Sequence, residues 1–220
     1  MAIKSISKIK EKAAASKGFQ GDGESPFLQL KEPGDVKVRF LQELDEDSAG
    51  YDERRGLVYV YEEHSSPKDF KKQAECTAES EGHCWACEQT SNPDIGKKWK
   101  GKLRFIANVL VRNPDGEEKV KLFKRGFSDK DVGTDLLDFA EEYGSISGQD
   151  MKIKREGKGM NDTKYSIIPL PPKKLTKAEE ELELIDPVKF VKQIPYADQA
   201  AFYLGESDGD GGSSGDWVSK

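Results

Sequence analysis

The sequence predicts a mainly β fold with some α-helix, because short stretches of alternating apolar and polar residues recur along it. In the clearest stretch, Leu103, Phe105, Ala107, Val109 and Val111 share one parity, with Lys102, Arg104, Asn108 and Arg112 on the other. A helical pattern covers residues 131–143, with Gly144 as its stop. Five or six strands, one helix and one polar insertion predict a five-stranded Greek-key barrel of the OB type, with the helix between its third and fourth strands.

The other elements follow from the same patterns. Further strands are expected over residues 36–40, 57–61, 119–125, 151–155 and 164–170. Between His64 and Cys87 there is no periodicity, which indicates a polar loop. We therefore expect a basic N-terminal arm over 1–20, followed by a barrel over 21–172 with an insertion at about 62–90. A helical extension is expected over 173–204, with a charged helix at about 174–185. The last segment, 205–220, is expected to be a disordered acidic tail.

The composition limits the classes of function. At 220 residues the chain holds one sizeable core with tails, or two small domains. No apolar run approaches the roughly 18 residues of a membrane span, and the N-terminus lacks an apolar signal region, so a cytoplasmic location is expected. No phosphate-cradling glycine loop, nucleophile motif or carboxylate cluster at metal spacing is found, so an enzyme is not expected.

Charge is segregated along the chain, although the net charge is −6. Residues 1–20 carry five lysines and one glutamate, and residues 97–130 carry eleven lysines and arginines against four acids. Residues 205–220 carry four acids and one lysine. A solvated face could explain any one of these blocks, but the three together favour a basic binding surface and an acidic tail that competes for it.

All three cysteines of the chain lie in the insertion, close to a histidine. The two residues between Cys84 and Cys87 let both thiolates turn onto one metal, and Cys76 with His64 completes a tetrahedral set. Four protein ligands close the site, so one structural zinc is expected. The alternatives are that the cysteines are free, or that His83 is the fourth ligand, although it adjoins Cys84 and would find it hard to reach the same ion.

The strand at 119–125 is the best candidate for a nucleic-acid surface. We expect Lys121, Phe123 and Arg125 to point outward, where base stacking on an aromatic ring is worth about 1–3 kcal/mol; alternatively, Phe123 packs beneath the terminal helix. Phe105 shares the parity of Val109, which favours burial. The other candidates are the cations Lys102, Arg104, Arg112, Lys124, Lys152, Lys154 and Arg155, and the aromatic residue Tyr165. Tyr59, Tyr61 and Trp99 are further candidates, each equally open to ordinary packing.

Over residues 1–170 the chain resembles the T-even bacteriophage type of single-stranded DNA-binding (helix-destabilising) protein. The resemblance rests on Lys17-Gly18-Phe19 after a basic arm, Val38-Arg39-Phe40-Leu41, the order His64, Cys76, Cys84, Cys87, the strand Ala107-Asn108-Val109-Leu110-Val111, and Lys121-Leu122-Phe123-Lys124.

This resemblance implies an OB core with an inserted zinc subdomain. It also implies an arm, carrying Lys4, Lys8 and Lys10, for cooperative self-association along the strand. The acidic C-terminus would contact replication proteins such as a polymerase, a helicase or its loader. Phe105 would contact DNA, against the parity argument. Ile106 stands where the family has a second aromatic residue, and Arg125 where it has a tyrosine, so we expect weaker stacking and more reliance on cations.

The sequence thus predicts a sequence-independent single-stranded DNA-binding protein of DNA replication, recombination and repair, of phage type. The alternative is a zinc-ribbon interaction module, for example a transcription adaptor, whose basic face meets protein or duplex DNA. A preference for duplex over single strands would favour that alternative.

Deletion of residues 205–220 is expected to raise the affinity for single-stranded DNA, because it removes four competing negative charges. Titration of a labelled homopolymeric oligonucleotide at low salt measures the change. Unchanged or weaker binding of the truncated chain would contradict a competing role for the tail.

Overall fold

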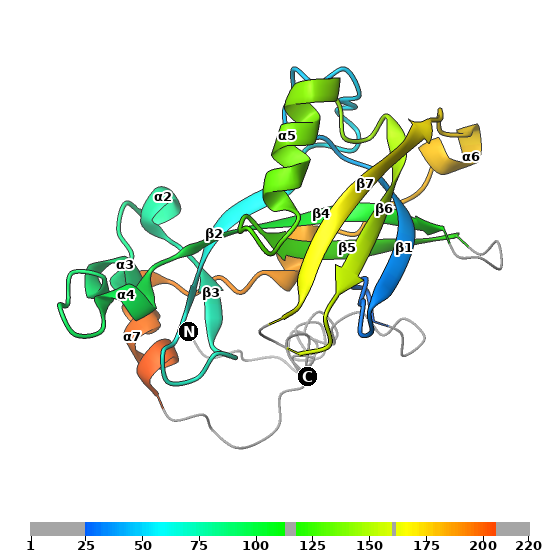
Figure 1. The fold of residues 1–220 in the computed structure, drawn as a ribbon. Helices are drawn as coiled ribbons and strands as arrows, with labels where there is room; N and C mark the ends of the chain where they lie inside the picture. The colour runs from blue at the N-terminus through cyan, green and yellow to red at the C-terminus, as the bar shows by residue number, and fades with distance from the viewer. Residues whose placement is uncertain (1–24, 113–117, 160–161, 206–220) are drawn as a thin grey trace, which may run out of the picture.

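The computed structural model describes residues 25–112, 118–159 and 162–205. Within these ranges, seven antiparallel strands form one sheet that does not close on itself, accompanied by several short helices (Figure 1). The mainly β fold with some α-helix is therefore confirmed. The predicted arm, with Lys4, Lys8 and Lys10, and all but the first residue of the acidic tail lie outside the described residues. No helix in the described ranges is both long and apolar enough to cross a membrane.

The long strand β4 organises the sheet. The strands are β1 (Gly34–Phe40), β2 (Tyr59–Ser65), β3 (Gln73–Glu75), β4 (Lys102–Arg112), β5 (Glu118–Gly126), β6 (Gln149–Glu156) and β7 (Lys164–Pro172). One edge of β4 pairs with β2 and then with β1, while β5 pairs along the other edge. β1 continues the sheet to β6 and β7. Six of the seven strands were expected from their alternation.

Helix α5 (Gly133–Tyr143) lies between β5 and β6 in the chain and covers the inner face of the sheet (Figure 1). Its predicted stop is confirmed, since Gly144 adopts φ +71° and its amide donates to the Ala140 carbonyl. Leu136 and Phe139 of the helix join a core that includes Phe105 and Phe123, whose ring centroids are 6.0 Å apart.

The predicted orientation of β5 is wrong. Lys121 and Phe123 pair with Val109 and Ala107 of β4, so Phe123 faces the inner core and is fully buried. Leu122 faces the other side, where Val191 of the C-terminal extension covers it. Apolar side chains cover both faces of the sheet at β5. The alternation of apolar and polar residues therefore shows which side chains share a face, but not which face is exposed.

The insertion is folded, where the sequence indicated only a polar loop, and it extends to Trp99 rather than ending near residue 90. It contains β3 and the helices α2 (Ala78–Glu81), α3 (Trp85–Gln89) and α4 (Gly96–Trp99). Helices of four or five residues are too short to show a periodic pattern, which explains why the sequence did not reveal them. Ala86, Trp99 and Tyr203 belong to a second buried cluster, separate from the core beneath α5.

The C-terminal extension packs against both parts of the molecule. It comprises α6 (Lys177–Glu180), the 3-10 helix η1 (Pro187–Phe190) and α7 (Tyr196–Leu204), so the longer helix expected at about 174–185 is limited to one turn. The buried Asn108 side chain in β4 fastens the extension, because it both donates to and accepts from the backbone of Ile185, at 3.0 and 2.8 Å. Helix α7 lies beside α3 (Figure 1).

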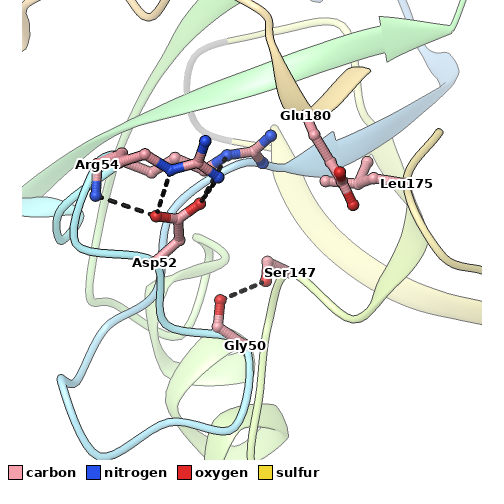
Figure 2. Close-up of a pocket in the computed structure, with 7 residues that line it drawn as sticks. Gly50, Asp52, Arg54, Ser147, Leu175 and Glu180 are labelled. Carbon is pink, nitrogen blue, oxygen red and sulfur yellow. Dashed lines mark hydrogen bonds and ion pairs between the residues drawn. The ribbon is translucent and has the colours of Figure 1, made fainter. Parts of the chain in front are cut away.

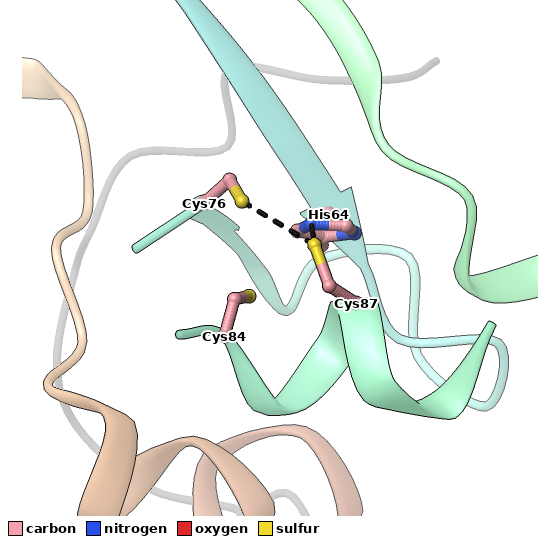
Figure 3. A group of neighbouring side chains, drawn as sticks. All are labelled: His64, Cys76, Cys84 and Cys87. Atoms are coloured by element: carbon pink, nitrogen blue, oxygen red, sulfur yellow. Dashed lines mark hydrogen bonds between the residues drawn. The ribbon is translucent and has the colours of Figure 1, made fainter. Parts of the chain in front are cut away.

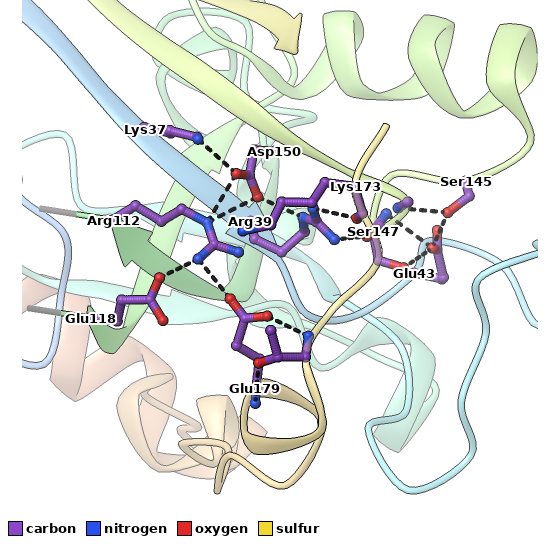
Figure 4. Close-up of polar contacts among 12 residues, drawn as sticks. Lys37, Arg39, Glu43, Arg112, Glu118, Ser145, Ser147, Asp150, Lys173 and Glu179 are labelled. Atoms are coloured by element: carbon purple, nitrogen blue, oxygen red, sulfur yellow. Dashed lines mark hydrogen bonds and ion pairs between the residues drawn. The ribbon is translucent and has the colours of Figure 1, made fainter. Parts of the chain in front are cut away.

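A buried ion-pair network joins β1, β4 and β6 (Figure 4). Asp150 accepts from Arg39 at 2.9 Å, from Arg112 at 3.0 Å and from Lys37 at 2.9 Å. Arg112 also contacts Glu179 of α6 at 2.6 Å. Burial raises the pKa of Asp150, but the hydrogen bonds from Lys37 and Arg112 and the charge of Arg39 outweigh it and lower that pKa.

We expect Asp150→Ala to lower the free energy of unfolding by about 3 kcal/mol, because it leaves buried guanidinium groups without their shared partner. Urea denaturation at pH 7 measures the loss, and Glu156→Ala, which removes an exposed pair with Lys154, serves as the control with little expected effect. Because the folded pKa of Asp150 is depressed, its contribution is complete above the unfolded pKa and is lost as the pH falls through the folded one. A variant as stable as the wild type at pH 7 would contradict this role.

Candidate metal centre and nucleic-acid surface

Four side chains of the insertion converge on one point (Figure 3). The ligand atoms of His64, Cys76, Cys84 and Cys87 all lie within 4.8 Å of one another. The Cys87 sulfur is 3.5 Å from the Cys76 sulfur and 3.3 Å from His64 Nε2. Zinc–sulfur bonds of about 2.3 Å in a tetrahedron place sulfur atoms about 3.8 Å apart. The four side chains are therefore close enough to hold one metal ion, consistent with the expected structural zinc.

Local structure explains the convergence. The hairpin of β2 and β3 pairs His64 with Ala74, which brings Cys76 alongside the histidine. Cys84 occupies the N-cap of α3 and Cys87 lies in its first turn, so one short helix presents both thiols to the same side. The Cys-x-x-Cys spacing of the sequence thus corresponds to one turn of helix.

The imidazole of His64 is oriented by the backbone of α4. Its Nδ1 donates to the Trp99 carbonyl at 2.8 Å, which leaves the lone pair of Nε2 directed at the three thiols. The rival residue, His83, is exposed and packs edge-on against Tyr196 with ring centroids 4.2 Å apart, outside the group of four. His64 is therefore the histidine of the candidate centre.

The charge balance of the four side chains calls for a cation. Burial raises the pKa of all three thiols. For Cys84 the hydrogen bond with His64 and the backbone hydrogen bonds of Cys87 and Thr77 together outweigh burial, and its pKa falls to about 6. The pKa of Cys87 is instead raised by burial and by its thiol neighbours. A divalent ion bound by these side chains would stabilise the thiolate form of all three, because nearby positive charge favours the ionised thiol.

Helix α7 closes the centre through Gln199, a residue that the sequence did not single out. The fully buried Gln199 accepts from the Trp85 amide at 2.9 Å and from the Cys84 sulfur at 3.4 Å, and donates to Thr77 at 2.8 Å. A glutamine 115 residues from Cys84 gives no local signal of this contact. The metal ligands and α7 therefore form one packed unit.

Most of the aromatic residues proposed for base stacking are buried. Phe105, where the resemblance implied DNA contact and parity implied burial, is 0% exposed, as is Phe123. Trp99 is 2% exposed and packs against Trp85 and Tyr203 beside the metal ligands. These three rings are not available for stacking in this structure, and the parity argument for Phe105 is confirmed.

Several proposed cations have partners within the protein. Arg112 belongs to the network around Asp150, and Lys154 pairs with Glu156 at 2.6 Å. The Arg155 guanidinium donates to the Leu30 and Lys31 carbonyls. Lys152 pairs with Asp35 at 3.1 Å. The Lys121 ammonium donates to the Ser25 carbonyl at 2.7 Å. Arg125 lies over the rings of Phe123 and Tyr165, 5.0 and 4.1 Å from their centroids. These contacts support the fold at the positions where the sequence suggested phosphate contacts.

The remaining candidates come together on the outer face of β2, β4 and β5. This face carries Tyr59, Tyr61, Lys102, Arg104 and Lys124, which we call the strip. The two tyrosine rings stack with centroids 5.4 Å apart, and the Lys124 ammonium lies 5.6 Å from the centroid of Tyr61. Tyr61 is 5% exposed, so the accessible part of the strip consists of Tyr59 and the cations.

The structure also has two depressions, of which the second adjoins the strip at Lys102. One is lined by residues that include Gly50, Asp52, Arg54 and Ser147, and there Asp52 is engaged by Arg54 at 2.7 Å (Figure 2). The second is a groove on the insertion, lined by Pro67, Phe70, Lys97, Lys98, Lys100, Gly101 and Lys102. Of these only Lys102 was singled out from the sequence, although the cluster of lysines at 97–102 could have identified the site.

Comparison with known proteins identifies no relative. Scans of family models, of curated proteins and of solved structures return no match for this chain.

Replacement of a metal ligand tests the centre. Cys84→Ser is expected to lose about one zinc per chain and to lower the melting temperature, because binding of a structural metal contributes to folding. His83→Ala, which changes a histidine outside the four, is expected to keep its zinc. Metal analysis and thermal melts of both purified variants make the comparison. A wild-type protein without zinc, or zinc loss from the His83 variant alone, would contradict the assignment.

Proposed function

We propose that this chain binds single-stranded DNA without sequence preference, as a zinc-containing accessory protein of DNA replication, recombination and repair. The observation that carries the proposal is the strip, where two tyrosine rings on β2 lie beside cations on the adjacent strands β4 and β5. Proteins that bind single strands combine a basic path for the phosphates with aromatic surfaces for the bases. The strip offers both, although its stacking surface is small.

Glu63 controls the charge of the strip. Its buried carboxylate contacts Arg104 at 3.3 Å and Lys124 at 2.6 Å, and it accepts from the Tyr61 hydroxyl at 3.2 Å. The carboxylate holds both cations extended across the face while neutralising part of their charge. A phosphate that approaches the strip would compete with Glu63, which predicts modest affinity and a steep dependence on salt.

The order of the strands supports an OB-type core within the sheet. In such a barrel the first strand pairs with the second and fourth, the second with the third, and the fourth with the fifth. With β1, β4, β5, β6 and β7 as the five strands, all these pairings are present and α5 follows the third strand. The pairing of β5 with β7 that would close the barrel is absent from the described registers. At that seam, Arg125 of β5 stacks on Tyr165 of β7 instead.

Duplex binding, the alternative, has less support. Proteins that read duplex DNA commonly place a helix in the major groove. In the described ranges the helices longer than five residues are α5 and α7, and both carry acidic residues without a lysine or arginine. The basic residues lie on strands and short connections, which suit a flexible single strand better than a rigid duplex. A role in replication, with partners recruited through the acidic tail, rests on the family resemblance.

Variants of the strip test the proposal. The double variant Arg104→Ala/Lys124→Ala is expected to weaken binding of a labelled oligothymidylate about tenfold or more at low salt. It should also reduce the salt slope by about 1.4, since each single-strand phosphate contact contributes about 0.7. Fluorescence anisotropy at several salt concentrations provides both values. The control Lys158→Ala/Lys164→Ala removes the same charge from exposed positions outside the strip.

Glu63→Gln provides a change of opposite sign. It keeps the side-chain shape but removes the charge that competes with phosphate, so the affinity is expected to rise. A strip that served only to stabilise the fold would not gain affinity in this variant. Failure of the wild-type protein to bind the oligonucleotide, or tighter binding of duplex than of single strand, would overturn the proposed function.

A further inference from the structure

The groove on the insertion combines features that a purely structural surface would avoid. Phe70, in the connection between β2 and β3, is 76% exposed, the highest value among the large apolar side chains of the described residues. The groove has a volume of about 490 Å³. Besides Phe70, four lysines line it: Lys97, Lys98, Lys100 and Lys102. An exposed phenylalanine beside four like charges costs solubility and Coulomb energy unless an anionic, planar ligand occupies the site.

The four lysines stand outside the ion pairs that the described residues form. In the described part of the chain none of them takes part in an ion pair, whereas most cations first considered for DNA binding do. Lys97 and Lys98 lie in α4, Lys100 is the C-cap residue of that helix, and Lys102 begins β4. The groove therefore has a higher uncompensated positive charge than the strip.

The walls of the groove are fixed by buried contacts. Trp99, between the lysines in sequence, is 2% exposed, and its carbonyl accepts from His64 of the candidate metal centre at 2.8 Å. On the opposite wall, the buried Ser66 precedes Pro67 and donates to the Tyr203 carbonyl at 2.9 Å. Because both walls are tied to the packed metal unit, a ligand would meet a preformed surface.

We infer that a single strand of nucleic acid enters this groove, with a base stacked on Phe70 and phosphates against Lys97, Lys98 and Lys100. Lys102 lines the groove and also belongs to the strip, two residues before Arg104 on the same face of β4, so one strand can follow both surfaces. The inference rests on the proposed function, which it extends from the sheet to the insertion. Charge complementarity selects a polyanion, and the exposed ring selects one that carries planar bases.

Variants of Phe70 test the stacking. Phe70→Ala is expected to weaken binding of a labelled oligothymidylate roughly fivefold or more, as for loss of one stacked base. Phe70→Trp is expected to restore the affinity, whereas Phe70→Leu is not, because it keeps the apolar character without the ring. Since Phe70 is exposed, the melting temperature and zinc content of these variants should match those of the wild type.

The triple variant Lys97→Ala/Lys98→Ala/Lys100→Ala tests the phosphate contacts. Its salt slope is expected to fall by about 2, from three contacts of about 0.7 each. The matched triple variant Lys158→Ala/Lys164→Ala/Lys177→Ala carries the same net charge from exposed positions elsewhere, and its slope is expected to stay at the wild-type value.

The outcomes separate the groove from the proposed function. Wild-type binding by the Phe70 and lysine variants, together with a loss in the strip variant, would overturn the groove and leave the function intact. Absence of oligothymidylate binding by the wild-type chain would overturn both. A polyglutamate peptide identifies the other occupant: if the lysine triple variant loses the peptide but keeps the oligonucleotide, the groove binds an acidic segment and the inference is wrong.

Discussion

The convergence of one imidazole and three thiols joins the central sheet to the short helices of the insertion, which share few other contacts. His64 belongs to the central sheet, whereas Cys84 and Cys87 belong to a helix of five residues. A helix of that length is not stable alone, and the insertion has only a small buried cluster of its own. An ion bound by these four side chains would fix the insertion to β2 and, through the Trp99 carbonyl, would also fix α4. The candidate groove and the fold of the insertion thus depend on the same contacts.

Two buried amide side chains give the C-terminal extension its place. Asn108 holds the extension where it crosses the sheet, and Gln199 holds it against the metal unit. Each amide satisfies backbone groups that would otherwise be buried without partners, which makes these contacts costly to lose. Through them the extension covers the apolar outer face of β4 and β5 and thereby limits the part of that face that a ligand can reach.

The parts that could be predicted from the sequence are those encoded locally. Alternation located six strands, Gly144 marked the end of α5, and the spacing of Cys84 and Cys87 pointed to the four residues that converge. The sequence of β5 does not show which of its side chains face outward, because this depends on which face of the sheet the C-terminal extension covers. The role of Arg112 could not be read either, since Asp150 and Glu179 reach it from distant parts of the chain. Parity was reliable for Phe105, which lies in a strand with an unbroken apolar face.

The late position of the extension in the chain has a consequence for how the protein folds. Its fastening contacts join residues far apart in sequence, such as Ser66 with Tyr203, separated by 137 residues, and Asn108 with Ile185, separated by 77. Contacts of such long range give a high contact order, which slows folding. During synthesis, strands β4 and β5 emerge well before their cover, so Ile106 and Leu122 face solvent until residues near 191 have been added. The nascent chain therefore passes through a stage with an uncovered apolar sheet face, when premature association with other chains is the main hazard.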